Sequence, residues 1–315
     1  MRIGLDAMGG DFAPEAVVCG AIMAQEELSS DDRIVLFGRQ DEILRIISEQ
    51  GVDASAFDIV HTEQVIDMHD KPIKAFSQKP DSSLAVGFRY LKAKKIDSFA
   101  SAGSTGAMLV GTMYSVGVME KVLRPCLAAL IPKEKGGVSL LVDVGVNPDA
   151  KPELLYQFGL LGSIYAKCAL GIEDPKVALA NIGEEEEKGN AQTQAAHKLM
   201  KQSKQYNFIG NAEPIEIFRS NADVIVCDGF VGNMLMKHTE AFARVIVKRG
   251  LVDEYIARFN YEIYGGLPLL GANGVVIIGH GVSNKKAIKS MILQSKKIYT
   301  SGITEKLHES LLDEE

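Results

Sequence analysis

Polar and glycine residues gather directly after short apolar runs at several places in the chain. In the clearest case, four glutamates follow the run Val177 to Ala180, and Lys188, Gly189 and Asn190 come next. Acidic side chains suit the positive end of a helix, so a plain helix start explains the glutamates. An active-site loop explains them equally, because a lysine between strand-end glycines can supply positive charge to a phosphate or to a developing oxyanion. The neighbouring glutamates are then expected to hold the lysine protonated and in place.

Five other segments combine glycine with aspartate, asparagine, serine or histidine in the same way. They span residues 6–11, 101–106, 143–147, 228–233 and 279–284. Ligands of parallel α/β sheets bind outside the carboxyl ends of the strands, so we expect the six segments to converge on one cleft. The candidate substrate-binding and phosphate-binding residues are Asp6, Gly9, Gly10, Asp11, Ser101, Gly103, Ser104, Thr105, Gly106, Asp143, Asn147, Asn181, Gly183, Asn190, Asp228, Gly229 and Asn284.

A serine, an aspartate and a histidine also follow one another along the chain in the order of a serine-hydrolase triad. Ser104 lies in a segment close to a nucleophile elbow, Asp143 or Asp228 follows, and His280 comes last. Such an order arises easily by chance in a chain of this length, and a hydrolase is one alternative. His280 can instead shuttle a proton, because two glycines leave it room to face a ligand. An asparagine such as Asn233 can bind an oxyanion or simply cap a helix.

Alternating strands and helices are expected to position these residues. Apolar runs predict strands at 3–5, 34–37, 98–100, 138–142, 177–180, 224–226 and 275–278, and helical patterns cover 14–28, 83–95, 107–118, 153–170, 191–202 and 232–247. This alternation favours an α/β fold with a mainly parallel sheet.

Composition argues against several other classes of protein. The net charge of −7 and the lack of a long basic block argue against nucleic-acid binding. The cysteines form no C-x-x-C pair and the histidines show no ligand spacing, so we expect no metal. Neither a dinucleotide fingerprint nor a Walker A loop is present, and we expect no cofactor. No signal-peptide pattern and no apolar run of about 18 residues is found, which predicts a cytoplasmic protein.

Two sets of basic residues recur at helical spacing. A solvated helix face is the usual explanation, although a basic strip on an acidic protein can also receive an acidic partner. The two strips are Lys285, Lys289 and Lys296, and Lys237, Arg244 and Lys248.

Seven motifs, taken in order, resemble those of the bacterial phosphate acyltransferases, the acyl-carrier-protein:phosphate transacylases or PlsX proteins. The resemblance covers nearly the whole chain. The motifs are IGLDAMGGD at 3–11, SAGSTGA at 101–107, DVGVN at 143–147, NIGEEEEKGN at 181–190, CDGFVGN at 227–233, YGGLPLLGANG at 264–274 and HGVSN at 280–284.

This resemblance implies a fold and an activity. The family moves a long-chain acyl group from the thioester of acyl carrier protein to inorganic phosphate, giving acyl phosphate for phospholipid synthesis. Its fold is a three-layer α/β/α architecture similar to isocitrate and isopropylmalate dehydrogenases and phosphate acetyltransferases, so residues 1–315 are expected to form one catalytic unit. The family is typically a homodimer. It associates peripherally with the membrane through a helical hairpin that corresponds to residues 240–266, where Leu251, Val252, Tyr255, Ile256 and Phe259 recur at helical spacing. The same apolar stripe also suits a dimer interface.

The resemblance also implies active-site residues. The lysine of K-G-N and the asparagine of G-F-V-G-N correspond to Lys188 and Asn233, and His280 is the candidate for proton transfer. Position 104, a serine here, is more often asparagine in the family, and position 282, a valine here, is often serine. Because asparagine functions at this position in the family, a nucleophilic serine at 104 cannot be essential to the reaction. We therefore expect phosphate to attack the thioester directly, without an acyl-enzyme. The alternatives are a Ser104 thioesterase, a metal-dependent decarboxylating dehydrogenase and a carrier-binding or membrane-docking scaffold.

Overall fold

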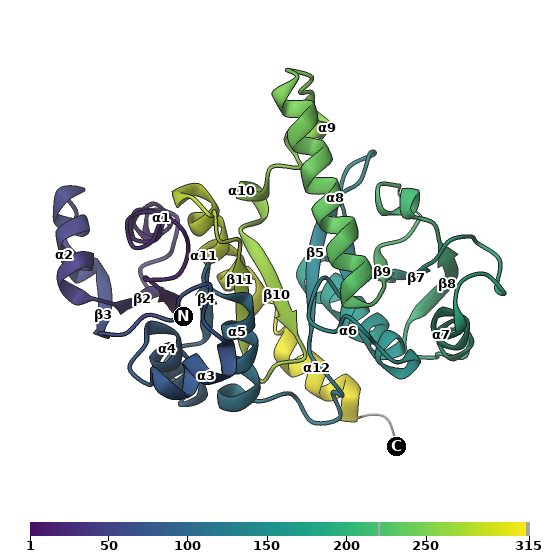
Figure 1. Cartoon of the computed structure of the whole chain (residues 1–315), viewed down its shortest axis with the longest axis horizontal. Helices are drawn as coiled ribbons and strands as arrows, with labels where there is room; N and C mark the ends of the chain where they lie inside the picture. The colour runs from purple at the N-terminus through teal and green to yellow at the C-terminus, as the bar shows by residue number, and fades with distance from the viewer. Residues whose placement is uncertain (220, 313–315) are drawn as a thin grey trace. The chain divides into compact units, whose positions relative to one another are not determined.

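The computed structural model describes residues 1–219 and 221–312, which divide into two compact units (Figure 1). Unit 1 comprises Met1–Met119 and Tyr261–Thr304, and unit 2 comprises Glu120–Asn260 and the chain from Glu305 onward. Each unit carries its own run of mainly parallel strands. The α/β prediction is therefore confirmed. The expectation that both units serve one catalytic body stays a prediction.

The sheet of unit 1 has the strand order β3-β2-β1-β4-β11-β10, and the paired neighbours are parallel except for the antiparallel β10 and β11. Its strands are β1 (Arg2–Asp6), β2 (Arg33–Gly38), β3 (Phe57–His61), β4 (Ser98–Ser101), β10 (Gly266–Leu270) and β11 (Val275–Gly279). Residues 34–37 of β2 are all buried. Strands that are covered on both faces carry such continuous apolar runs, which is why the sequence pattern was readable.

Helices cover both faces of this sheet (Figure 1). Helix α1 packs against α2 and α11, and α4 packs against β1, β2 and β4. The usual right-handed crossover predicts α1 and α2 on one face and α4 on the other, because the chain first moves from β1 toward β3 and then returns to β4. Helix α1 packs closely on α11, where a Cβ added to Gly20 would lie 2.6 Å from Ile288. The helices are α1 (Glu15–Gln25), α2 (Gln40–Glu49), α3 (Pro72–Gln78), α4 (Ser83–Lys92), α5 (Thr105–Gly111), α10 (Tyr261–Tyr264) and α11 (Lys285–Thr300), with a 3-10 turn at Ala54–Ala56 and a π turn at Thr112–Val116.

The sheet of unit 2 has the order β5-β6-β9-β7-β8, with β5 and β6 antiparallel and the other pairs parallel. Helices α6 and α7 pack together, and α6 lies so close to the sheet that a Cβ on Gly162 would be 2.6 Å from Val224. The strands are β5 (Cys126–Pro132), β6 (Val138–Val142), β7 (Lys176–Ala180), β8 (Asn207–Ala212) and β9 (Val224–Val226); the helices are α6 (Pro152–Leu170), α7 (Ala191–Lys201), α8 (Gly229–Lys248) and α9 (Glu254–Ala257), with a 3-10 turn at Pro214–Ile217. Helix α12 (Ile303–Leu312) ends the described chain.

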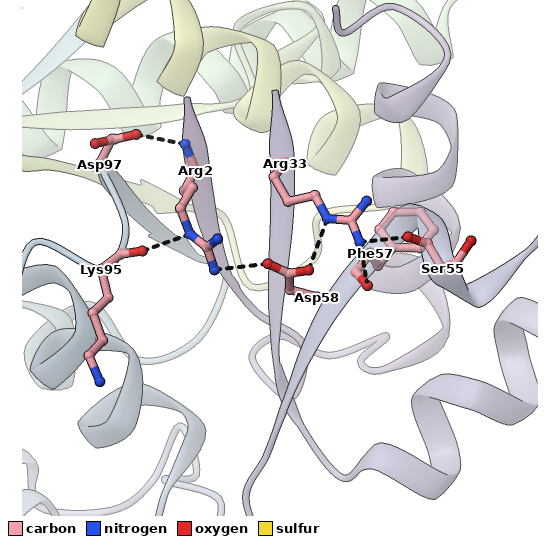
Figure 2. Close-up of polar contacts among 7 residues, drawn as sticks. All are labelled: Arg2, Arg33, Ser55, Phe57, Asp58, Lys95 and Asp97. Carbon is pink, nitrogen blue, oxygen red and sulfur yellow. Dashed lines mark hydrogen bonds and ion pairs between the residues drawn. The ribbon is translucent and has the colours of Figure 1, made fainter. Parts of the chain in front are cut away.

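An ion network ties together the amino ends of β1, β2 and β3 (Figure 2). Asp58 accepts a hydrogen bond from Arg2 Nη2 at 2.8 Å and from Arg33 Nε at 2.9 Å. Arg2 Nε also donates to the Lys95 carbonyl at 2.9 Å. These side chains are a third to a half exposed, so each pair adds at most about 1 kcal/mol to stability. The network therefore sets strand alignment at the end of the sheet opposite the polar loops.

A second carboxylate, Asp32, is buried with 6% of its surface exposed. Its Oδ2 lies 2.6 Å from Lys296 Nζ and accepts a hydrogen bond from Ser29 Oγ at 2.7 Å. Burial raises the pKa of this carboxyl, but the bonds from Lys296 and Ser29 outweigh burial and hold the pKa well below its usual value. The folded protein is therefore stabilised by the ionised form of Asp32.

We expect Asp32→Asn to lower the free energy of unfolding by about 1–3 kcal/mol near neutral pH. Because the folded-state pKa is depressed, the stabilisation is complete above the unfolded pKa of about 4 and is lost as pH falls through the folded value. Urea midpoints of wild type and variant should therefore converge in acid. Asp41→Asn, an exposed carboxylate at the start of α2, is the control and should differ little from wild type at any pH. A gap for Asp32→Asn that stays constant with pH would contradict this account.

Candidate active site

Three of the predicted polar segments lie in unit 1, at the carboxyl ends of the neighbouring strands β1, β4 and β11. Strand register aligns Leu5 with Ala100 and Ala100 with Ile277, so these segments leave the sheet at one level. The first and last are joined directly, because the Asp11 N–H donates to the Gly281 carbonyl at 2.8 Å. Within the first segment, Gly10 adopts a φ of +111°, a backbone conformation that residues with side chains disfavour.

A hydrogen bond between Asp6 and Ser101 joins the segments 6–11 and 101–106. Asp6 is 1% exposed, and its Oδ2 accepts a hydrogen bond from Ser101 Oγ at 2.6 Å. Ser101 Oγ in turn accepts the Gly103 N–H at 2.9 Å. Burial raises the pKa of Asp6 against the opposing effect of its hydrogen bonds, the strongest being that from Ser101. Gly9 lies against this pair, where an added Cβ would collide with the Asp6 carboxylate. In the structure, therefore, the Asp6 carboxylate bonds neighbouring loops.

The remaining unit 1 candidates begin helices or lie beside them. Ser104 is the N-cap of α5, with its Oγ accepting the Ala107 N–H at 3.4 Å, and it is followed by the exposed Thr105 and the half-buried Gly106. Asn284 is the N-cap of α11. Both residues therefore cap helices, which for Asn284 is the alternative role considered for such asparagines.

The Nδ1 atom of His280 accepts a backbone hydrogen bond, whereas a hydrolase triad needs a donor there. Its Nδ1 lies 3.3 Å from the Val282 N–H, so this ring nitrogen accepts a hydrogen bond from the backbone. In a triad the same nitrogen donates to a carboxylate. The two carboxylates considered for that role are also engaged in unit 2, Asp143 by its own loop and Asp228 as the N-cap of α8. The Ser104 triad is therefore not supported.

The other three polar segments lie in unit 2, after β6, β9 and β7. Register aligns Val142 with Val226 and Val226 with Leu179, so these segments also leave their sheet at one level. Asp143 organises the first of them. It is fully buried, and its carboxylate accepts the N–H groups of Leu127 at 2.9 Å and Asn147 at 2.7 Å.

Asn147 extends this framework to the start of α8. Its Nδ2 donates to Asp143 Oδ2 at 3.0 Å, and its carbonyl accepts the Gly229 N–H at 2.7 Å. Gly232 packs on the Asp143 carbonyl so closely that an added Cβ would collide with it. The framework therefore fixes the first turn of α8. Burial raises the pKa of the Asp143 carboxyl, and burial followed by the Asp143 charge raises that of the Cys227 thiol, so Cys227 is a poor nucleophile.

Lys188 is exposed in the segment after β7. Across residues 1–219 and 221–312, no carboxylate lies within 4.0 Å of its Nζ. The glutamates therefore do not hold this lysine through an ion pair: Glu186 pairs with Lys201 on α7, and it is the backbone N–H of Lys188 that donates to the Glu185 carbonyl, at 3.1 Å. The Lys188 stem runs past Gly183, where an added Cβ would lie 2.9 Å from Lys188 Cγ. The ammonium group is thus available for an anion.

The other polar residues of this segment shape its backbone. Asn190 is the N-cap of α7 and accepts the Thr193 N–H at 2.9 Å. Gly189 has a φ of +90° and touches Thr193 and Asn181, so no side chain fits there. Asn181 donates to the Lys188 carbonyl at 3.2 Å.

Asn233 differs from the other candidate asparagines. It lies exposed at the start of the second turn of α8, and within the described chain its side-chain amide makes no hydrogen bond. A Cβ on Gly145 would be 3.6 Å from Asn233 Nδ2, so the amide lies over the glycine of the Asp143 loop. Within the described residues, therefore, the Lys188 ammonium has no carboxylate partner and the Asn233 amide has no hydrogen bond.

Two further residues of this region were missed by sequence reasoning. Asn211 of β8 and Gln194 of α7 donate to carbonyl groups of the Lys188 segment. Neither stands in a motif, and each lies inside a regular element, so only the pairing of β8 with β7 and the packing of α7 reveal them.

The predicted basic strips are partly occupied by internal ion pairs. Lys289 pairs with Glu27, and Lys296 pairs with Asp32. Both Lys237 and Arg244 lie 3.7 Å from Glu240. These contacts favour the solvated-face interpretation for the first strip and reduce the free charge of the second.

Residues 240–266, where a hairpin is predicted, contain the end of α8, the short helices α9 and α10 and the turns between them. The apolar residues of this segment divide into two groups. Tyr255 and Phe259 face the protein, since their rings pack 5.1 Å apart and Tyr255 Oη donates to the Pro132 carbonyl at 3.2 Å. Leu251 and Val252 are instead 62% and 50% exposed. In the described residues no helix has both the length and the apolar character to cross a membrane. Over the same residues, no cluster of three His, Cys, Asp or Glu is arranged to hold a metal ion.

Comparison with known proteins places this fold. The structure is similar to a phosphotransacetylase from Streptococcus pyogenes, with a TM-score of 0.69 at 17% identity over 97% of this chain and 94% of the other. It is also similar to isocitrate dehydrogenase from Methylococcus capsulatus, with a TM-score of 0.50 at 10% identity over 99% and 91%. Identities this low establish the fold alone, and they confirm the predicted resemblance to isocitrate dehydrogenase.

Sequence comparison identifies the family. A family model described as "Fatty acid synthesis protein" matches residues 1–306. The chain is 39% identical to a phosphate acyltransferase of Dictyoglomus turgidum, over 99% of this chain and 98% of that protein. It is 41% identical to a phosphate acyltransferase of Syntrophomonas wolfei, over 97% of both chains. The chain therefore belongs to the phosphate acyltransferase family of lipid-synthesis enzymes.

Proposed function

We propose that this enzyme transfers a long-chain acyl group from the thioester of acyl carrier protein to inorganic phosphate. A phosphate oxygen attacks the thioester carbonyl carbon, a tetrahedral intermediate forms, and the C–S bond breaks. The products are acyl phosphate and the carrier-protein thiolate, which takes a proton from solvent. No acyl-enzyme and no cofactor take part. Phosphate is an adequate nucleophile when it is held in line, so positioning supplies much of the rate.

The unpaired ammonium of Lys188 is the observation that carries this proposal. A surface lysine surrounded by four glutamates is expected to pair with one of them, yet Lys188 has no carboxylate partner among residues 1–219 and 221–312. An unneutralised cation on an anchored strand-end loop suits a phosphate dianion. In our proposal Lys188 binds the attacking phosphate.

Asn233 is proposed to stabilise the oxyanion. Its amide is exposed, lies at the start of the second turn of a long helix and has no hydrogen-bond partner within the described residues. A donor that is free in the resting enzyme can bond the charge that develops on the thioester oxygen. The segment 101–106 stays a predicted phosphate contact, and His280 stays a predicted proton-transfer group.

Thiol release from palmitoyl-acyl carrier protein tests the reaction directly. We expect release to require inorganic phosphate, and hydroxylamine to trap the product as a hydroxamate. Equal release without phosphate would indicate a thioesterase, and no release in either condition would overturn the enzymatic proposal. Ser104→Asn separates the two chemistries further, because a serine nucleophile would be lost whereas direct phosphate attack should survive.

We also propose that the enzyme is a cytoplasmic homodimer that binds membranes peripherally through the α8–α9 hairpin. The exposed Leu251 and Val252 support the membrane contact, and Lys248 and Arg249 beside them suit an anionic surface. Replacing Leu251 and Val252 with aspartate is expected to abolish cosedimentation with anionic phospholipid vesicles. Unchanged sedimentation would remove the hairpin from the proposal. Light scattering that gives the mass of a single chain would overturn the dimer.

A further inference from the structure

The backbone around Lys188 is held by amide side chains from strand β8, from helix α7 and from the residue that directly follows β7. We call residues 183–189 the Lys188 loop. Asn211 Nδ2 donates to the Glu185 carbonyl at 2.7 Å, and Gln194 Nε2 donates to the Glu187 carbonyl at 2.6 Å and the Gly189 carbonyl at 3.2 Å. Asn181 Nδ2 donates to the Lys188 carbonyl at 3.2 Å. The carbonyl groups of residues 185 and 187–189 are therefore all bonded by side chains.

The Asn211 amide is itself oriented by a buried histidine. His197 Nδ1 lies 3.0 Å from Asn211 Oδ1, and the His197 ring packs edge-on against Phe208 at 5.2 Å. A donor at the amide oxygen leaves the Asn211 Nδ2 group to face the loop. Asn211 lies on β8, where it is paired in register with Leu179 of β7. The anchor thus rests on the sheet.

Neutral amides suit this task because they anchor the loop without neutralising its lysine. A carboxylate cannot donate to a carbonyl, and an arginine or lysine anchor would add a positive charge that repels the Lys188 ammonium. Amide side chains donate to the backbone carbonyls and add no net charge near the Lys188 ammonium. Among the four glutamates of the segment, Glu186 pairs with Lys201.

We propose that Asn211 and Gln194 are positioning residues that hold the Lys188 ammonium in place for phosphate. This inference rests on the proposed function, in which Lys188 binds phosphate. Loss of either amide frees part of the loop backbone, and the ammonium then samples positions away from the phosphate. The effect falls on phosphate use, because phosphate is the ligand of Lys188 in the proposed function.

Two variants and a matched control test this. Asn211→Leu and Gln194→Met remove the donors at nearly constant side-chain size. Asn207→Leu is the control, since Asn207 lies on the same strand but donates to Asp174 at 2.7 Å, away from the loop. We expect each anchor variant to lower kcat/KM for phosphate about tenfold, mainly through KM, and Asn207→Leu to match wild type.

Trypsin supplies a second readout that does not depend on catalysis. Cleavage after Lys188, identified by mass spectrometry, is expected to be faster in the anchor variants than in wild type or in Asn207→Leu. In a Lys188→Ala background, Asn211→Leu should add little further loss of activity, because the group it positions is gone. A merely structural defect would cost the same factor in both backgrounds.

The outcomes separate the two proposals. Suppose that Lys188→Ala is impaired but the anchor variants have the same phosphate kinetics as Asn207→Leu. That result would overturn the positioning role and leave the proposed function standing. An equal additional loss in the Lys188→Ala background would also overturn it. Wild-type activity of Lys188→Ala would overturn the proposed role of the lysine and, with it, this inference.

Discussion

Lys188→Ala is expected to lower kcat/KM for phosphate by about 10²–10³-fold while the fold stays intact. The loss corresponds to roughly 3–4 kcal/mol of binding and transition-state stabilisation, the size found when one preorganised charged or hydrogen-bonding group is removed. Lys188 is exposed and makes no ion pair with the described residues, so its removal should change stability by less than about 0.5 kcal/mol. Steady-state kinetics with varied phosphate and a melting curve measure both quantities.

Two further variants sharpen this result. Lys201→Ala removes a nearby exposed lysine that pairs with Glu186 and should leave the kinetics unchanged. Lys188→Arg keeps the charge but changes its shape, and partial activity would indicate that charge matters more than the geometry of a compact ammonium. Near-normal kinetics for Lys188→Ala would remove the residue from the mechanism.

Asn233→Ala is expected to lower kcat by about 10²–10³-fold with little change in the KM for phosphate. The reason is that an oxyanion donor acts only when the tetrahedral charge develops, so ground-state binding is unaffected. The contrast with Lys188→Ala, which should raise the phosphate KM, distinguishes the two roles. Alanine favours the helix, and the amide bonds nothing in the described structure, so the α8 fold should be preserved.

Met234→Ala is the matched control for Asn233→Ala. Met234 is the next residue of α8 and is 60% exposed, so its truncation tests whether any change in this turn disturbs catalysis. Its kinetics should stay close to wild type. If Asn233→Ala raised KM without lowering kcat, the amide would be assigned to substrate binding and the oxyanion role would be overturned.

The sequence by itself determined the fold class, the strand-end segments and the family. These follow from local patterns: buried parallel strands are continuous apolar runs, and turn and cap residues mark where they end. Thus β2, β6, β7 and β11 lie where the apolar runs predict them. The strands β3, β5, β8 and β10 were not predicted.

Only the tertiary structure decided which polar side chains are available for chemistry. Asn190, Asn233 and Asn284 look alike in sequence, each following glycine or serine near a helix start. In space Asn190 and Asn284 are caps, and Asn233 alone of the three has an unbonded amide within the described residues. An asparagine satisfies its hydrogen bonds with whichever groups the packed backbone brings near it, and spacing along the chain does not specify those groups.

The setting of Lys188 shows the same limit. Its glutamate neighbours in sequence suggest ion pairs, whereas the structure pairs Glu186 with Lys201 and anchors the loop through Asn211 and Gln194. These partners lie on another strand and on a helix, and only the registry of β8 with β7 and the packing of α7 bring them to the loop. Contacts between segments distant in sequence depend on the whole packed sheet, which is why they could not be derived from the local pattern.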